Sequence, residues 1–212
     1  MNIQIIGSTN FLKEIDTIKR FSYNCGRICY SEKDFREVQI EKIDEKLMNH
    51  MINAGHHSIF EHANLNLYMT GIPKILVMVL NNEKQYSTSE KSARYTKMSD
   101  IEPSQNEKYE KWMNIFVPEI DKIYPKIVDK KRKENITKLA KENARYMTSV
   151  FTPTKMAHTV NLRQLNFLYI QLEKFHEEHS NSENLFNRRL SQSIKEFLPY
   201  IEQFRIDGLD NQ

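Results

Sequence analysis

Cysteine and long apolar runs are scarce in this chain. Its 212 residues include two cysteines, Cys25 and Cys29, which are too few for a disulfide framework or a four-ligand zinc site. No stretch approaches the roughly 20 apolar residues of a membrane-spanning helix. The opening residues also lack the basic and apolar segments of a signal peptide. We therefore expect a cytoplasmic protein with two free thiols and no membrane contact.

Charge of one sign is not in excess either. The chain has 31 basic and 28 acidic residues, a net charge of +3, which does not call for a nucleic-acid or membrane-surface partner. Any site for an anion must therefore be local. With 39% hydrophobic and 10% aromatic residues, the chain has enough apolar material for one globular domain spanning residues 1–212.

Apolar residues recur with two periods, which predicts both strands and helices. Strands are expected at 2–6 and 63–69, and Gly71 should end the second, whose polar face is available for a subunit contact. Pro118 and Pro125 should kink or divide one of the helices, and the aromatic stripe around its Trp112 is interpreted as core packing. Helical spacing is found at residues 11–21, 40–52, 107–128, 136–147 and 185–201.

The segment from Ser87 to Tyr95, STSEKSARY, concentrates polar chemistry. It combines a carboxylate, a guanidinium and several hydroxyls at short spacing. A solvated helical face is the alternative interpretation. The apolar run at residues 75–80 precedes the segment, so that a buried element would deliver its end into this polar cluster, the usual way in which a scaffold presents a site.

A second polar segment, His56 to His62, holds three histidines and a glutamate. Neither HExxH nor HxxEH is present, and Ser58 stands where HxxEH would need its first histidine, so we expect no metal here. An alternative role for Glu61 and His62 is to cap the loop through hydrogen bonds to the backbone.

The stretch NEKQYSTSEKSARY, residues 82–95, resembles the signature RHRxxSxNExSxRY of the flavin-dependent thymidylate synthases. It differs in the opening triplet, where Asn82, Glu83 and Lys84 replace Arg, His and Arg, and at Ser89, which replaces Asn. The signature residues that the chain keeps are Ser87, Glu90, Ser92, Arg94 and Tyr95.

Other segments agree with this family in order and spacing. The spacing from Gly71 to the triplet equals that of the family. Arg27, Tyr30 and Ser31 match a small-residue segment of the family, and the pair Ala144-Arg145 also matches. Asn161, sixteen residues after Arg145, matches together with Arg163. A GHxSxFEH-like segment is matched by Gly55, His56, Ser58, Phe60, Glu61 and His62.

The resemblance implies a fold and an activity. The fold would be α/β (α+β), with a twisted, mostly antiparallel sheet flanked by helices, assembled as a homotetramer with sites between subunits. The reaction would be the reductive methylation of dUMP to dTMP. FAD would carry reducing equivalents from NADPH, and methylenetetrahydrofolate would supply the carbon, so that the protein positions and polarises its ligands. Neither cysteine is expected to take part.

The resemblance also implies roles for the matching residues. Arg94 and Arg145 would hold the nucleotide phosphate, for which the arginine fork is suited. Glu90, Ser92 and Arg94 would form the catalytic group between nucleotide and flavin, and Ser87 would add a substrate contact. The residues expected at the cofactor are Ser31, His56, Ser58, Lys84, Glu90, Asn161 and Arg163.

Three departures keep two other functions open. Besides the triplet, Val79 replaces a glutamine and Gln171 replaces an arginine, both of which bind the nucleotide in the family. The chain would then modify another pyrimidine nucleotide, or serve as a non-catalytic nucleotide-binding partner. Because the triplet has lost charge-assisted donors, we expect the protein to purify largely without flavin, or to hold FAD differently from its relatives.

Overall fold

The computed structural model describes residues 1–9, 14–38, 42–82, 85–98, 100–126 and 130–209. Its strands are β1 (Asn2–Ser8), β2 (Asn64–Pro73), β3 (Tyr86–Glu90) and β4 (Pro153–Asn161). Its α-helices are α1 (Ile15–Arg27), α2 (Phe35–Val38), α3 (Glu45–Asn53), α4 (Lys74–Leu80), α5 (Pro103–Ile123), α6 (Arg132–Ala144), α7 (Leu162–His179) and α8 (Leu185–Ile201). Short 3₁₀ turns are η2 (Ile28–Tyr30), η3 (His57–Glu61), η4 (Arg145–Met147) and η5 (Glu202–Phe204).

The four strands form one antiparallel sheet in the order β1-β2-β4-β3. Strand β2 pairs with β4 along its whole length, from Asn64 opposite Asn161 to Pro73 opposite Pro153. The prediction that Gly71 ends this strand is wrong. Gly71 has a φ of +67° and lies where the register shifts, so it forms a bulge that glycine accommodates at low cost, and pairing then resumes.

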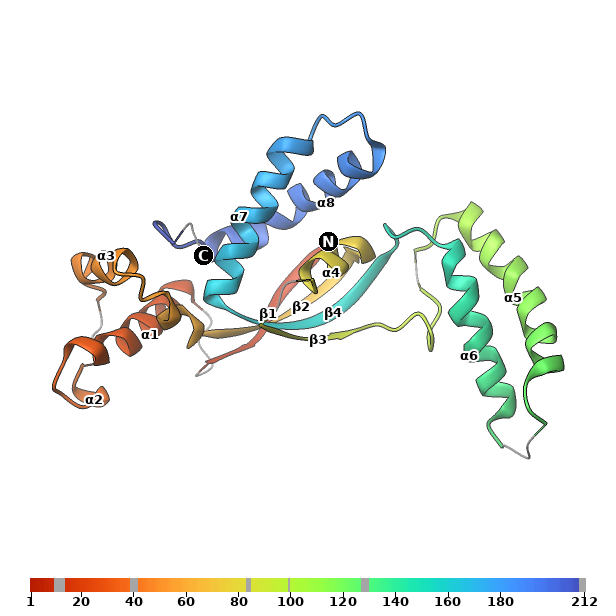
Figure 1. Cartoon of the computed structure of the whole chain (residues 1–212), viewed down its shortest axis with the longest axis horizontal. Coiled ribbons are helices and arrows are strands. Elements are labelled where there is room, and N and C mark those ends of the chain that lie inside the picture. The colour runs from red at the N-terminus through yellow and green to blue at the C-terminus, as the bar shows by residue number, and fades with distance from the viewer. Residues whose placement is uncertain (10–13, 39–41, 83–84, 99, 127–129, 210–212) are drawn as a thin grey trace.

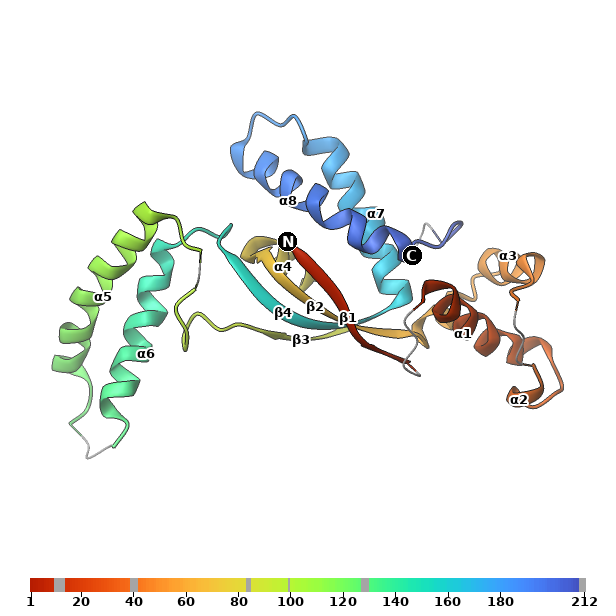
Figure 2. The same cartoon turned by 180° about the vertical axis from the view of Figure 1, so that it is seen from behind.

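Helices α4, α7 and α8 lie over one face of the sheet (Figures 1 and 2). The core forms there, because the residues that point to this face alternate along each strand. Leu65, Leu67 and Met69 on β2 are each at most 1% exposed, as are Met156 and Val160 on β4. The intervening residues of β2 are more polar and less buried, which confirms the predicted two-faced strand.

Helices α1, α2 and α3 stand at one end of the sheet, and the α5–α6 pair extends from the other end (Figure 1). The prediction that the aromatic stripe of α5 packs in the core is wrong. Tyr109 is the only buried residue on α5 within the part of the chain that the structure describes. Ile123 is 81% exposed, and Trp112 stacks on Phe116 with ring centroids 5.1 Å apart. The helix packs against α6 rather than the sheet, so its apolar face is only partly covered.

Several helix boundaries differ from the prediction for local reasons. Helix α3 begins at Glu45 because the Asp44 carboxylate accepts a hydrogen bond from the backbone N–H of Lys46, at 3.0 Å, as an N-cap. Helix α5 begins at Pro103, a residue type favoured at the first helical position, and is not divided at Pro118. The structure confirms the predicted helix at 185–201.

Two other helices are shifted. Helix α1 runs from Ile15 to Arg27, later than the predicted 11–21, of which residues 11–13 lie outside the described ranges. Helix α6 starts at Arg132, earlier than the predicted range of 136–147. Its last residue is Ala144, after which η4 continues to Met147. Leu139, an apolar residue in the middle of this helix, is 38% exposed. None of the helices described is both long and apolar enough to cross a membrane.

Candidate functional site

The polar segment around Ser87 divides into a strand and a turn, so the solvated helical face is the wrong interpretation. Strand β3 ends at Glu90, and a turn follows in which the Ser92 hydroxyl accepts from the backbone N–H of Arg94 at 3.3 Å. The Ser92 carbonyl accepts from the N–H of Thr96 at 3.1 Å. These bonds fix the direction in which the chain leaves the sheet. Ser87 lies in mid-strand opposite Thr159 and is exposed.

The turn after β3 forms one wall of a cavity with a volume of ≈ 540 Å³, which we call the cationic cavity. Its other walls are the start of α4, η4 and the connection from η4 to β4. It brings together four residues that the sequence assigned to the nucleotide, Glu90, Ser92, Arg94 and Arg145. The lining residues are Lys74, Met78, Glu90, Lys91, Ser92, Ala93, Arg94, Met98, Arg145, Tyr146, Thr148, Ser149, Val150 and Thr152.

Positive charge dominates this lining. Lys74, Lys91, Arg94 and Arg145 face one carboxylate, Glu90. Lys74 pairs with that carboxylate, whose side chain is 15% exposed. The second oxygen of Glu90, Oε1, is buried and has no hydrogen-bond partner among the described residues. Apart from this pair, the lining holds two arginines and a lysine.

A second acidic side chain, Glu142 on α6, contacts the arginines. Its Oε1 lies 2.7 Å from Nη2 of Arg94 and 4.0 Å from Nη2 of Arg145. Nε of Arg145 also donates to the backbone carbonyl of Glu142 at 3.1 Å. The two arginines, 51 positions apart in the chain, therefore converge on one carboxylate oxygen.

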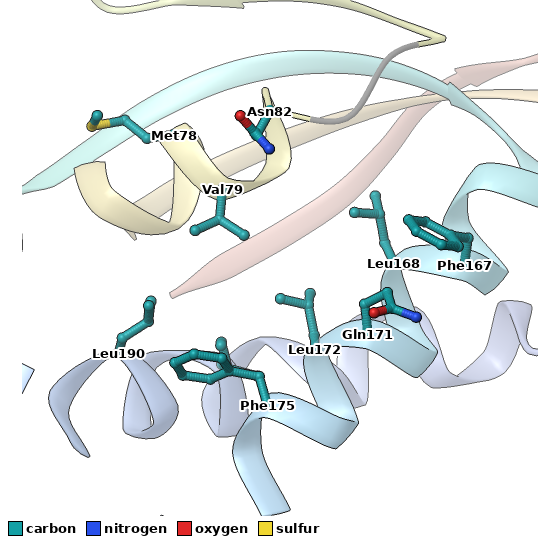
Figure 3. Close-up of a pocket in the computed structure, with 10 residues that line it drawn as sticks. Met78, Val79, Asn82, Phe167, Leu168, Gln171, Leu172, Phe175 and Leu190 are labelled. Atoms are coloured by element: carbon teal, nitrogen blue, oxygen red, sulfur yellow. The ribbon is translucent and has the colours of Figure 1, made fainter. Parts of the chain in front are cut away.

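A separate cavity of ≈ 430 Å³ lies between α4 and the α7–α8 hairpin, and we call it the neutral cavity. In Figure 3, Val79 of α4 points toward Leu172 and Leu190 across the gap. The only polar side chains in its described lining are two carboxamides, Asn82 and Gln171. The lining residues are Met78, Val79, Asn82, Phe167, Leu168, Gln171, Leu172, Phe175, Leu190 and Ile194.

The neutral cavity gathers three of the positions at which the sequence departs from the synthase family. Val79, Asn82 and Gln171 come from α4, the residues after it and α7, yet all three line this cavity. At these three positions the chain presents one apolar side chain and two uncharged carboxamides to the cavity. Glu83 and Lys84, the rest of the triplet, lie outside the described residues.

Of the residues predicted to face the cofactor, Glu90 lines the cationic cavity, whereas His56, Ser58, Asn161 and Arg163 lie near the other end of the sheet, around η3 and the start of α7. The Arg163 guanidinium pairs with the Glu61 carboxylate at 2.5 Å, so Glu61 does not merely cap its loop. Nδ1 of His56 and the Tyr30 hydroxyl are 2.9 Å apart. Ser58 in η3 is exposed.

Two more of the predicted cofactor residues have structural partners. Asn161 is 7% exposed, and its Oδ1 accepts from the backbone N–H of Gln164 at 2.7 Å. It is therefore the N-cap of α7. The Ser31 hydroxyl accepts from the N–H of Lys33 at 3.1 Å.

Arg94 and Arg145 are far from Asn161 and Arg163 within one chain, whereas Ser87, opposite Thr159, lies near the Asn161 end of β4. Strand β4 separates the first pair from the second, because Asn161 is at its end and the connection from Arg145 enters at Pro153. From Pro153 to Asn161 the strand rises by eight residues at about 3.3 Å each, which places its ends roughly 26 Å apart. One chain therefore holds the phosphate-type residues and the cofactor-type residues at opposite ends of its sheet.

Sequence reasoning missed Lys74, Lys91 and Glu142. A spacing of three residues between Glu142 and Arg145 signals a contact on a helix, but nothing in the sequence joins Glu142 to Arg94. It also missed His158 on β4, which is 2% exposed and stacks on Tyr86 with centroids 5.3 Å apart. Burial lowers the pKa of His158 to about 4, which keeps its imidazole neutral.

Cys25 and Cys29 are both free thiols. Burial raises the pKa of the Cys25 thiol, while Cys29 is exposed. A raised pKa disfavours the reactive thiolate. Within the described ranges, no three His, Cys, Asp or Glu side chains gather as metal ligands.

Comparison with known proteins identifies the family. The family model for the thymidylate synthase complementing protein, Thy1, matches residues 11–194. The chain belongs to this family. This confirms the prediction made from the signature residues, and the departures at the neutral cavity mark a divergent member.

Similar curated proteins agree with this assignment. The chain is 28% identical over 162 residues to a flavin-dependent thymidylate synthase of Clostridium tetani, a match covering 67% of this chain and 64% of the relative. It is also 28% identical over 164 residues to a probable flavin-dependent thymidylate synthase of Mycobacterium phage L5, covering 72% and 66%. The matches thus span slightly less than two thirds of the length of each relative.

Solved structures share the fold. The Helicobacter pylori flavin-dependent thymidylate synthase ThyX, crystallised with FAD and dUMP, superposes with a TM-score of 0.52 at 18% identity over 100% of both chains. The Streptomyces cacaoi UMP/dUMP methylase PolB, bound to 5-Br dUMP, gives a TM-score of 0.51 at 14% identity over 79% of this chain and 76% of its own. Both confirm the predicted α/β class, an antiparallel sheet flanked by helices.

Proposed function

We propose that this protein is a flavin-dependent thymidylate synthase that binds the phosphate of dUMP in its cationic cavity. The observation that carries the proposal is the convergence of Arg94 and Arg145 on one point of that cavity, beside Ser92 and Glu90. Arginine forks give two parallel charge-assisted hydrogen bonds to phosphate oxygens. Two guanidinium groups that converge on one point are suited to binding a phosphate monoester.

The reaction would be the reductive methylation of dUMP to dTMP. Bound FAD would supply the redox chemistry, with NADPH and methylenetetrahydrofolate as co-substrates. Within this chain, Arg94 and Arg145 would fix the nucleotide through its phosphate. The Ser92 hydroxyl and the Glu90 carboxylate, on the same wall, would orient the rest of the nucleotide, and Lys74 would hold Glu90 in place.

The residues at the η3 end fit a flavin by their chemistry. Arg163, His56 and Ser58 carry hydrogen-bond donors or mixed donor–acceptor groups, which match the carbonyl and phosphate oxygens of such a cofactor. Their partners within the chain, Glu61 and Tyr30, would hold the donors in position. Ser31 and Asn161 would support the same region, and Lys84 would add a cation near the phosphates.

The reaction requires nucleotide and flavin to touch, so the roughly 26 Å between their residues implies that different copies of the chain contribute them. We propose a homotetramer with sites between subunits. Exposed apolar side chains at the cationic cavity support this, since Tyr146 is 72% exposed, Met78 52% and Val150 42%. Large exposed apolar side chains grouped around a polar site are typical of an interface.

We propose a single domain for residues 1–212 and a cytoplasmic location. Helix α8 is bonded to the first residue, because the Tyr200 hydroxyl donates to the backbone carbonyl of Met1 at 2.8 Å. One core also collects residues from the first strand to Leu209.

A second candidate function is modification of another pyrimidine nucleotide. The neutral cavity favours it, because Val79 and Gln171 replace polar and charged residues assigned to the nucleotide and thereby change what contacts the base. PolB, which shares the fold, is a UMP/dUMP methylase. A non-catalytic nucleotide-binding partner would share the phosphate site but lack flavin. Comparing UMP, dUMP and dCMP as substrates distinguishes these functions.

Calorimetric titration with dUMP tests the proposal. Replacement of Arg145 by Ala should weaken binding by about 1.5 to 3 kcal/mol, the range for hydrogen bonds to a charged group. Arg132→Ala is the matched control, because Arg132 pairs with Asp121 outside the cavity, and it should leave the affinity unchanged. Equal affinities of Arg145→Ala and the native protein would remove Arg145 from the site.

A visible spectrum of the purified protein, followed by titration with FAD, tests the cofactor. The lost triplet predicts a protein that is largely colourless as purified and takes up FAD weakly. Tight stoichiometric binding of FAD would contradict that expectation. Failure to bind FAD at any concentration would favour the non-catalytic partner.

A further inference from the structure

Glu142 stands where an anion would be held. Its Oε1 is 2.7 Å from Arg94 and 4.0 Å from Arg145, so one oxygen takes the place between the guanidinium groups that a phosphate oxygen would take. Both arginines line the cationic cavity, whereas Glu142 is not part of the lining. The carboxylate thus approaches them from the side of α6.

We propose that Glu142 is an internal counter-anion of the cationic cavity, which an incoming phosphate must displace from Arg94 and Arg145. The inference rests on the proposed phosphate site. Glu142 would therefore set the affinity of that site, lowering it below the value that two unopposed arginines would give.

The charges around the cavity indicate that Glu142 competes with an incoming anion for the arginines and does not assist its binding. The four cationic side chains are opposed by Glu90 and Glu142, which leaves a net charge of +2. Neutralising Glu142 would raise this to +3. Lys74 already pairs with Glu90, so Glu142 is the carboxylate that acts directly on the two arginines.

Partial exposure limits the size of the effect. The side chains of Arg94, Arg145 and Glu142 are 55%, 34% and 31% exposed. Water screens ion pairs at this exposure, and such pairs contribute little to stability. A carboxylate held this weakly can be displaced by a phosphate, whose charge is close to −2 and which carries three acceptor oxygens.

If Glu142 competes through its charge, the gain in affinity on neutralising Glu142 should depend on the charge of the ligand. A carboxylate repels a dianion about twice as strongly as a monoanion at the same distance. Methyl phosphate and methanesulfonate are similar in size and shape but differ in charge at pH 8. A purely structural role for Glu142 would not separate these two ligands.

Calorimetric titration of the whole protein with each ligand tests the proposal. Glu142→Gln should bind methyl phosphate about three- to fivefold more tightly than the native protein, and methanesulfonate less than about twofold more tightly. Glu142→Asp keeps the charge and should stay within about twofold of the native protein for both ligands. Glu119→Gln is a control that removes one negative charge from an exposed pair with Lys122, and it should change neither affinity.

Unchanged or weaker binding of methyl phosphate by Glu142→Gln would overturn the proposal, because Glu142 would then position Arg94 instead of competing for it. A parallel titration with dUMP separates the two proposals. If methyl phosphate behaves as expected but dUMP does not bind, the nucleotide function is wrong and the role of Glu142 stands. If methyl phosphate binds to none of the proteins, both proposals are wrong.

Discussion

The two cavities of this protein lie on either side of Met78, which lines both, yet they have opposite chemistry. The cationic cavity has four basic side chains from segments far apart in the sequence. The described lining of the neutral cavity is apolar except for two carboxamides. Residues of the family signature are kept in the first cavity and replaced in the second. The proposed anion site therefore keeps residues of the family signature, and the cavity beside it does not.

This contrast indicates which part of a ligand each cavity can recognise. Paired arginines bind a phosphate through charge, and this recognition tolerates changes in the rest of the ligand. An apolar wall with two carboxamides discriminates shape and uncharged hydrogen-bonding groups instead. Changes in base or cofactor preference are thus expected at the neutral cavity, and loss of all nucleotide binding at the cationic one.

The largest expected effect on stability is in the floor of the neutral cavity. Ile194 is 1% exposed, and Ile194→Ala should lower the free energy of unfolding by about 2 to 5 kcal/mol through lost burial and a larger cavity. Leu185→Ala, on the same helix at 60% exposure, should change it by less than about 0.5 kcal/mol. Urea denaturation measures both. Similar losses for the two variants would show that this wall is not packed as described.

The next largest effect on stability is expected from His158, which is buried below the helices and lines neither cavity. Its pKa is lowered to about 4 in the folded protein from about 6.5 in the unfolded chain. The unfolded chain therefore binds the proton more tightly, and stability falls as the pH drops from about 6.5 to about 4. The total loss is about 3 kcal/mol, of which most appears below about pH 6.

Urea denaturation between pH 7.5 and pH 4 measures this loss. His158→Leu should flatten that part of the profile, whereas His62→Gln, which alters an exposed imidazole, should keep it. An unchanged profile in His158→Leu would assign the acid sensitivity to other groups.

A smaller effect is expected at the Lys74–Glu90 pair in the cationic cavity. Lys74→Ala leaves Glu90, at 15% exposure, without its cation. Because Lys74 itself is 40% exposed, water screens the pair, and the loss of stability should be about 1 kcal/mol. Lys122→Ala, at an exposed pair with Glu119, should cost less than about 0.5 kcal/mol. Equal values for both variants would mean that Glu90 is as well solvated as a surface carboxylate.

The sequence predicted the elements whose burial pattern is local. Alternation along β2 identified its buried face, and the apolar stripe at 185–201 identified α8, because each pattern repeats with the period of its own backbone. The matched signature residues identified Arg94, Arg145, Ser92 and Glu90, which the fold does bring to one cavity.

Tertiary contacts could not be predicted in the same way. The stripe on α5 gives an apolar face but not its partner, so the sequence did not reveal that α5 packs on α6 away from the sheet. The contact between Arg94 and Glu142 depends on a turn after β3 meeting a distant helix. The separation of the two groups of site residues depends on the length and direction of β4, which no motif encodes.

A crystal structure of this protein with dUMP tests the central claim most directly. We predict that the phosphate lies within hydrogen-bonding distance of the guanidinium groups of Arg94 and Arg145, with the Glu142 carboxylate displaced from Arg94. A phosphate bound in the neutral cavity or elsewhere, with the pair between Arg94 and Glu142 intact, would contradict the account.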